Sequence, residues 1–222
     1  MTVTVDNLTL LAEPHAQAAK TATAGKGTFV VRSRNFTVDG LECFGVSVRD
    51  RNGACIRQEV GTVNLRGVFF HHNQNGVLGT RKAESLNVHD SVFYANGQGQ
   101  WGKTHNIYVN GGALNFLRSY SLGAVREGHE LKNRGDASLI ENSIIASFNS
   151  QNSRSIDLPE DGHHVIRGNL IQQGPFSSNG DVIAAGLELP SGSRRTDNQV
   201  LVENNLFYLE RFKGNNLVHS AN

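Results

Sequence analysis

Four side chains that can donate, accept or neutralise charge recur in the middle of the sequence, at intervals of 24, 25 and 31 residues. They are Tyr108, Lys132, Asp157 and Glu188. Three of them stand between two apolar residues, which is the pattern of a strand that buries one face and exposes the other. If these strands stack in register, the four side chains form one exposed column. A lysine, a phenol and two carboxylates on one wall are sufficient for acid–base chemistry.

Further polar residues flank the column. The alternation that sends Lys132 outward also sends Glu130 outward and leaves Leu131 facing the core. His129 shares the inward phase of Leu131, so a core histidine bonded to a backbone carbonyl is at least as well supported as a catalytic one. The edges of the column are expected to hold His105, Arg134 and Arg154. A single charge on an exposed strand is usually an ordinary surface group, but the other repeats carry fewer such residues at these positions.

The elements that would position the column follow from a sequence motif that is repeated along the chain. The motif is an apolar residue, then polar or glycine residues, then apolar residues again. Successive copies begin 23 to 36 residues apart, with an earlier copy predicted at Val5–Leu8. A period in this range indicates a repeat architecture. The units contain β-branched and aromatic residues broken by Asn and Gly, which favours strands over helices. We therefore predict an all-β parallel β-helix of about seven or eight coils, with residues 1–222 as a single domain.

Bulk composition excludes several classes of function. The formal net charge is +1, and aromatic residues are not interleaved with basic runs, so nucleic-acid binding is not expected. No apolar stretch is long enough to span a membrane, and the N-terminal residues lack the basic segment and apolar run of a signal peptide. The sequence does not indicate the oligomeric state.

The remaining cysteines, histidines and loops carry weaker signals. Cys43 and Cys55 are either a disulfide or two buried free thiols, and the thiols are the interpretation that we favour. His163 and His164, like His71 and His72, are predicted to lie in turns with structural roles only. The polar stretch 190–198 accounts for the longest repeat interval and is expected to form a protruding loop.

The coil repeat, together with Lys132-Asn133-Arg134-Gly135 and the following Ile140–Ile144, resembles the pectate-lyase-like superfamily of right-handed parallel β-helix proteins. Many of its members cleave or epimerise acidic polysaccharides. The Lys-then-Arg order is similar to that of the superfamily's alginate-type lyases, although their usual Lys-Ser dipeptide is Lys132-Asn133 here. The resemblance implies an extracellular or periplasmic enzyme whose partner is an acidic polysaccharide.

The resemblance also implies roles for individual residues. Lys132 would be the base, with its pKa lowered by the neighbouring Arg134 and by bound sugar, and Tyr108 or His105 would protonate the departing oxygen. The substrate carboxylate would be neutralised by Arg134, by Arg154, or by a Ca²⁺ ion held by Glu130, Asp157 and Glu188. Asn110, Gln173 and Asn179 would hold sugar hydroxyls. Trp101, on a glycine-rich loop, would either stack on a sugar ring or anchor that loop.

These residues predict a polysaccharide lyase, or a C5-epimerase, that acts on a uronate-containing polymer. Two alternatives remain open. A glycoside hydrolase on the same fold would use Asp157 with Glu188 or Glu130 as its paired carboxylates. A non-catalytic carbohydrate-binding stack, of the tail-fibre or adhesin type, would need no reactive group at all.

Overall fold

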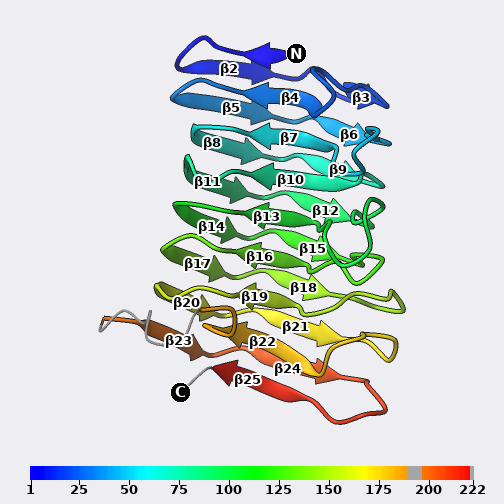
Figure 1. Ribbon diagram of the computed structural model, residues 1–222, viewed down its shortest axis with the longest axis vertical. Helices are drawn as coiled ribbons and strands as arrows, with labels where there is room; N and C mark the ends of the chain where they lie inside the picture. Colours follow the sequence, from blue (N-terminus) through cyan, green and yellow to red (C-terminus); the bar gives the residue numbers. More distant parts are fainter. Residues whose placement is uncertain (190–196, 221–222) are drawn as a thin grey trace.

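A computed structural model describes residues 1–189 and 197–220, and it confirms the predicted parallel β-helix. Each coil contributes one strand to each of three parallel sheets, so that the chain descends as a stack of coils from N-terminus to C-terminus (Figure 1). The described residues contain no helix. Within them no segment therefore qualifies as a helix that crosses a membrane.

The three sheets have nine, eight and eight strands. Sheet A contains β1 (Thr2–Val3), β4 (Gly27–Val31), β7 (Ala54–Gln58), β10 (Asn75–Gly79), β13 (Ile107–Val109), β16 (Leu131–Asn133), β19 (Ile156–Leu158), β22 (Asp181–Ala185) and β25 (Asn216–Ser220). Sheet B contains β2 (Leu8–Leu11), β5 (Asn35–Asp39), β8 (Gly61–Arg66), β11 (Ala83–His89), β14 (Ala113–Leu117), β17 (Ala137–Glu141), β20 (His163–Arg167) and β23 (Gln199–Glu203). Sheet C contains β3 (Gln17–Ala19), β6 (Glu42–Phe44), β9 (Phe69–His71), β12 (Val92–Tyr94), β15 (Tyr120–Leu122), β18 (Ile144–Ala146), β21 (Leu170–Gln173) and β24 (Leu206–Leu209).

The repeated sequence motif forms the corner between sheets B and C. One residue of each copy has a positive φ, which glycine adopts at little cost and asparagine and aspartate tolerate. The residues are Gly40, Gly67, Asp90, Arg118, Asn142, Gly168 and Asn204. The copy predicted at Val5–Leu8 is a different corner, because Asn7 joins β1 to β2, from sheet A to sheet B.

The residue after this corner position links each coil to the next. The Oγ of Ser91 accepts the N–H of Val68 at 3.2 Å, and the Oγ of Ser119 accepts the N–H of Ser91 at 3.1 Å. The same contact continues down the stack through Ser143, Asn169 and Asn205. These side chains satisfy backbone donors that would otherwise be buried without a partner, and they fix the vertical alignment of the coils.

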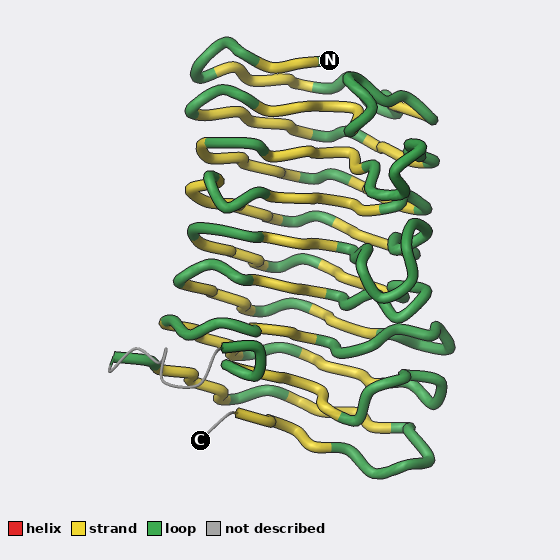
Figure 2. The backbone as a smooth tube through the Cα atoms, viewed as in Figure 1, coloured by secondary structure: helices red, strands yellow, loops and turns green. Residues whose placement is uncertain are grey.

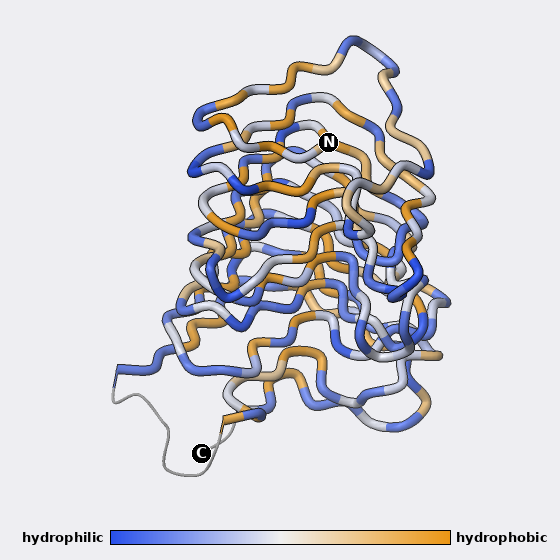
Figure 3. The backbone as a smooth tube through the Cα atoms, turned by 45° about the horizontal axis from the view of Figure 1, so that its top comes forward, coloured by the Kyte–Doolittle hydropathy of each residue, from blue (hydrophilic) through white to orange (hydrophobic). Residues whose placement is uncertain are grey.

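The interior of the stack is filled by the inward residues of all three sheets. Phe36, Phe70, Phe93 and Phe116 are among its largest fully buried side chains. Along strands of sheet B such as β5, β14 and β17, buried and less buried residues alternate, as one inward face requires. Figure 3 shows hydrophobic segments interspersed with hydrophilic ones through the stack. His71 ends β9, and His163 and His164 open β20, so the prediction that they lie in turns was wrong. His164 is buried, and its Nδ1 lies 3.0 Å from the Ser138 hydroxyl.

The connections from sheet C to sheet A include the longer loops of the stack, on the right of Figure 2. One of them, residues 95–106 between β12 and β13, carries Trp101 and the glycines around it. In the predicted loop 190–198, residues 190–196 lie outside the described part of the chain.

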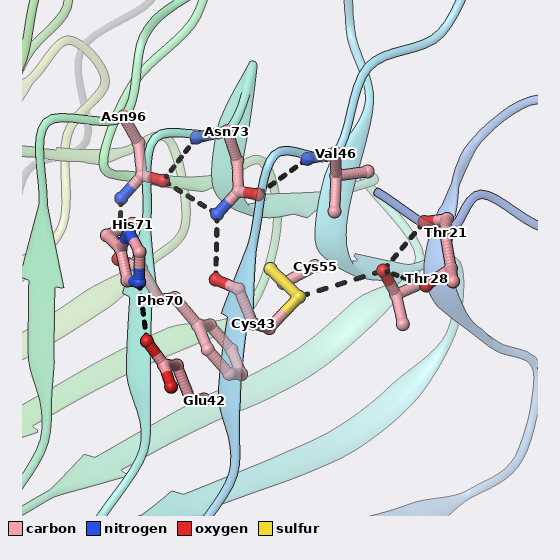
Figure 4. Close-up of a disulfide and its surroundings, with 10 residues drawn as sticks. All are labelled: Thr21, Thr28, Glu42, Cys43, Val46, Cys55, Phe70, His71, Asn73 and Asn96. Carbon is pink, nitrogen blue, oxygen red and sulfur yellow. Dashed lines mark hydrogen bonds and ion pairs between the residues drawn. A yellow bond between two sulfur atoms is a disulfide. The ribbon is translucent and has the colours of Figure 1, made fainter. Parts of the chain in front are cut away.

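Cys43 and Cys55 form a disulfide, which corrects the prediction of free thiols. Cys43 is in β6 of sheet C and Cys55 in β7 of sheet A, and both are fully buried (Figure 4). Beside the disulfide, Asn73 receives the backbone N–H of Val46 at 2.8 Å, and the amide of Asn73 donates to Asn96 at 2.9 Å. The disulfide therefore crosses the core next to a second ladder between coils.

Removal of this disulfide should destabilise the protein without changing its fold. The bond closes a loop with a sequence separation of 12 residues, for which the loss of chain entropy in the unfolded state is worth about 3 kcal/mol. We expect C43A/C55A to lose about that much free energy of unfolding in urea titrations. Reduced wild-type protein is the matched control, since it loses the bond but keeps both side chains. Two free thiols titrated in unreduced, unfolded wild-type protein would contradict the pairing.

Candidate active site

The outward face of sheet A carries the predicted column in part. Tyr108 of β13 lies directly opposite Lys132 of β16, and Lys132 lies opposite Asp157 of β19. The next residue in register is Ala184, not Glu188, so the prediction that Glu188 lies on a strand was wrong. The strand β22 begins at Asp181 and ends before Gly186, whose φ of 67° turns the chain. Glu188 therefore lies in the turn that follows.

Glu188 nevertheless reaches the column from its turn. One carboxylate oxygen is 3.1 Å from the Nζ of Lys132, and the other accepts a hydrogen bond from the guanidinium of Arg134. The carboxylate thus bridges two cations that lie two residues apart in the chain. Its side chain is 40% exposed, whereas that of Lys132 is 9% exposed.

These groups lie at a pocket of about 400 Å³ on the outward side of sheet A. The lining residues are Gly102, Lys103, His105, Tyr108, Lys132, Arg134 and Glu188. Three of them are cationic and one is acidic. Lys132 and Arg134 are already paired with Asp157, Glu188 and Glu160, so an anionic ligand would bind here by replacing one of these acids.

Asp157 is the fixed anion of the site. Its Oδ2 lies 2.5 Å from the Nζ of Lys132, and its Oδ1 lies 3.1 Å from the Nη1 of Arg154. Burial raises the pKa of the Asp157 carboxyl, but His129, Lys132 and Arg154 outweigh burial and bring the pKa below its ordinary value. Asp157 is 1% exposed. It is a buried carboxylate that stays ionised and holds Lys132 in place.

The imidazole rings of His105 and His129 stack on one another beside Lys132 and Asp157, with ring centroids 5.0 Å apart. The Nδ1 of His105 accepts the backbone N–H of His129 at 3.0 Å, and the Nδ1 of His129 accepts that of Arg154 at 3.1 Å. Each neutral ring must therefore carry its proton on Nε2. Burial lowers the pKa of His129 to about 4 and that of His105 well below its usual value, so both are neutral at neutral pH.

The two rings differ in what they face. The Nε2 of His129 lies 3.4 Å from Asp157, while His105 lines the pocket and packs edge-on against Tyr108. His129 is thus a buried residue that also contacts the carboxylate of the Lys132–Asp157 ion pair. His105 presents a neutral N–H donor to the pocket.

Glu130 lies inside the coil, so the prediction that it faces outward was wrong. It precedes the first residue of β16 and occupies the corner, where strand alternation does not apply. Its carboxylate accepts the amide of Asn106 at 2.6 Å, the backbone N–H of Ala124 at 2.9 Å and the amide of Asn152 at 3.5 Å. Amides from the coils above and below therefore donate to it, one to each oxygen of the carboxyl group.

The three proposed calcium ligands therefore do not form a site. Glu130 is enclosed by amides, and Asp157 and Glu188 are bound to Lys132, Arg134 and Arg154. Within residues 1–189 and 197–220 no cluster of three or more His, Cys, Asp or Glu side chains is arranged to hold a metal ion.

The other predicted residues are only partly brought together. Asn110 lies beside the pocket, with its Oδ1 3.4 Å from the hydroxyl of Tyr108. Arg154 is held by Asp157 and Asp181. Gln173 is buried on sheet C, where it donates to the carbonyl of Asn179 at 3.0 Å, so these two residues shape a turn and are not on the proposed sugar-binding face. Trp101 is 54% exposed on the loop whose next two residues line the pocket.

Sequence reasoning missed Lys103, Glu160 and Asp181. Lys103 lines the pocket, and its place in the same glycine-rich loop as Trp101 was the available signal. Glu160 lies 3.1 Å from the Nη1 of Arg134, and Asp181 lies 3.3 Å from the Nη2 of Arg154. Both acids sit outside the alternating positions of the column, one in a turn and one at the start of β22, so strand periodicity could not reveal them.

Comparison with known proteins adds no identity to this geometry. The chain matches no family model, no curated protein and no solved structure.

The buried acid makes a measurable prediction about pH. Burial raises the pKa of Glu130 to about 8 from an ordinary value of 4.5, although the surrounding donors favour its ionised form. Between those two values the folded protein keeps a proton that the unfolded chain has released, so this group's contribution to stability falls as pH rises. We expect the free energy of unfolding of wild type, relative to E130Q, to decrease across this interval. The comparison cancels the opposite effect of His105, His129 and His164, which both proteins share. A difference that stays constant with pH would contradict the raised pKa.

Proposed function

We propose that the protein is a polysaccharide lyase, or a C5-epimerase, that acts on an acidic, uronate-containing polysaccharide. The observation that carries this proposal is the position of Glu188, whose carboxylate bridges Lys132 and Arg134 at the rim of the pocket. A uronate carboxylate has the same charge and the same pair of acceptor oxygens. It can replace Glu188 between the two cations, because Glu188 lies on an exposed turn and not on a strand.

Two cations at a substrate carboxylate supply the first requirement of β-elimination. Removal of the proton at C5 places negative charge on the adjacent carboxyl group, which must be stabilised by fixed positive charge. Lys132 is held by Asp157 at 2.5 Å and is nearly buried, so its ammonium needs no reorganisation to meet that charge. These contacts favour Lys132 as the neutralising cation, in place of the base that the sequence suggested.

Tyr108 is then the group that transfers protons. It lies directly opposite Lys132 on the neighbouring strand and lines the same pocket. Once the Tyr108 hydroxyl has given its own proton to solvent, its oxygen accepts the C5 proton and the electron pair forms the C4–C5 double bond. The C4–O4 bond then breaks as O4 takes that proton from the Tyr108 oxygen. Protonation of the opposite face of C5, which requires a second proton donor on that face, would give the epimer with C4–O4 intact. His105 offers a neutral N–H to the same region and fits the binding of a sugar or carboxylate oxygen.

The resemblance of the Lys132-Asn133-Arg134 segment to alginate-type lyases of the pectate-lyase-like superfamily adds support from the sequence. In those lyases, as in the mechanism proposed here, a lysine and a neighbouring arginine act together. We expect the enzyme to function outside the cytoplasm, where such polymers occur.

A hydrolase is the second candidate, because Asp157 and Glu188 both contact the Nζ of Lys132, at 2.5 and 3.1 Å. Because both oxygens contact the same nitrogen, their separation cannot exceed the sum of these two distances, a range that includes the separation of about 5 Å typical of retaining glycosidases. Against this function, Asp157 is 1% exposed and bound by three cationic or histidine groups, which leaves it poorly placed to attack a sugar.

Loss of the Tyr108 hydroxyl tests the lyase directly. We expect wild type to generate the ultraviolet-absorbing unsaturated uronyl product from at least one of alginate, polygalacturonate, glucuronan or hyaluronan. Y108F should lower kcat about 100-fold or more, since positioned proton transfer contributes at least that factor. Y120F is the matched control, because Tyr120 is a half-exposed tyrosine on sheet C. Equal turnover by Y108F and Y120F would remove Tyr108 from the mechanism.

Substitution of Glu188 separates the two candidate enzymes. In a lyase, E188Q removes a competing carboxylate and should lower KM for the uronate polymer, with the unsaturated product still formed. In a hydrolase, E188Q removes one of the two reacting carboxylates and should abolish the release of reducing ends. If wild type forms neither product from the four polymers, the non-catalytic carbohydrate-binding stack becomes the favoured function.

A further inference from the structure

A second pocket lies along the edge of sheet A that is formed by the C-terminal ends of its strands, where Arg134 of the candidate site also lies. It has a volume of about 540 Å³ and is formed by the turns that follow β4, β7 and β10. Its lining residues are Arg32, Glu59, Val60, Thr80, Arg81 and Lys82. The strand β10 pairs with β13, which carries Tyr108, so this pocket begins one coil above the site in the view of Figure 1.

The charge of this second pocket is positive and only partly compensated. Glu59 is its one acid, and it is already bound by Arg32 at 2.6 Å and by Lys26. Burial raises the pKa of Glu59, but these two cations outweigh burial and lower it, so the carboxylate stays ionised and neutralised. Among the described residues the side chain of Lys82 has no partner. Arg81 is 75% exposed, and its one ion pair with a residue that the structure describes is a 3.6 Å contact with Glu160.

Arg57, two residues before Glu59 in the chain, is a further cation on this part of sheet A. It lies on the outward face of β7, opposite Leu78, which in turn lies opposite Tyr108. Its Nε is buried and has no hydrogen-bond partner within the described parts of the chain. A buried guanidinium N–H without an acceptor is costly, and the charge of Arg57 adds to the positive charge around this pocket.

Glu160 connects the second pocket to the candidate site. The same oxygen of Glu160 lies 3.6 Å from Arg81 and 3.1 Å from Arg134. Cations therefore continue along the edge of sheet A from Arg134 to Arg81 and Lys82. Two strand spacings, about 10 Å, separate β16 from β10, which exceeds the length of one sugar ring.

We propose that the pocket formed by Arg32, Arg81 and Lys82 binds a second carboxylate group of the same acidic polysaccharide, a few sugar units from the unit held at Lys132 and Arg134. This subsite rests on the proposed function for the identity of the polymer. It would orient the polymer parallel to the axis of the stack, so that successive carboxylates meet cations on successive coils. Short oligosaccharides would occupy the catalytic pocket alone.

The test compares R81E/K82E with wild type, using fluorescently labelled oligosaccharides of the polymers named above in two sizes, disaccharides and oligomers long enough to span both pockets. We expect the double variant to bind the long oligomers at least about tenfold more weakly, because charge-assisted hydrogen bonds are each worth about that factor. Binding and turnover of the short ones should be unchanged. The matched control is R66E/K213E, which makes the same change in net charge at exposed residues of sheet B and of the C-terminal region. The salt dependence of long-oligomer binding should also be weaker in R81E/K82E.

The outcomes separate the subsite from the catalytic function. Equal binding of long oligomers by R81E/K82E and R66E/K213E would overturn the subsite while leaving the lyase intact. Weaker long-oligomer binding by R81E/K82E, with no product formed by wild type, would support the subsite and overturn the lyase. Failure of wild type to bind any carboxylated oligomer would overturn both.

Discussion

The hydrogen bonds that pass from coil to coil at the buried corners are the constraint on which the rest of the structure depends. At the corner between sheets B and C, a Ser or Asn side chain accepts the N–H of the coil above, from Val68 down to Asn169. At the corner between sheets C and A, Asn73, Asn96 and Asn106 form a second ladder. A shift of one residue would bury an unsatisfied donor in every coil and turn each strand over. The ladders therefore fix which side chains stand above one another on sheet A.

This constraint explains how far the sequence could predict the structure. The coil repeat can be recognised in the sequence because most copies have a residue that tolerates positive φ, such as Gly67 or Asn142, followed by a small hydrogen-bonding residue. The alignment of Tyr108, Lys132 and Asp157 followed from that repeat and the alternation of strands. Glu130 and Glu188 were misplaced because they lie at a corner and in a turn, where alternation ends. The disulfide joins two different sheets, and nothing in the spacing of its cysteines specifies that the chain returns there.

Glu130 shows how the ladder and the site are coupled. Asn106 donates to it from the coil above and Asn152 from the coil below, so the direction of the amide ladder reverses at this residue. An asparagine would present an N–H₂ group to one of these donors, whereas both oxygens of a carboxyl group can accept a hydrogen bond. Glu130 is followed by Leu131 and Lys132, the first two residues of β16. The buried acid Glu130 thus lies immediately before the strand that carries Lys132, the central cation of the site.

The two anions of the site are held differently, one buried on a strand and one half-exposed in a turn. Asp157 is fixed by its strand and buried among Lys132, Arg154 and His129, so removing it would leave uncompensated charge in the interior. Glu188 contacts Lys132 and Arg134 from a turn and remains 40% exposed. An incoming carboxylate that replaces Glu188 exchanges one ion pair for another, so its affinity depends on contacts beyond the charge itself. For a ligand on this face, such contacts would come from neighbouring positions in the groove, among them Tyr108, His105 and Lys103 beside it and the cations of the coils above.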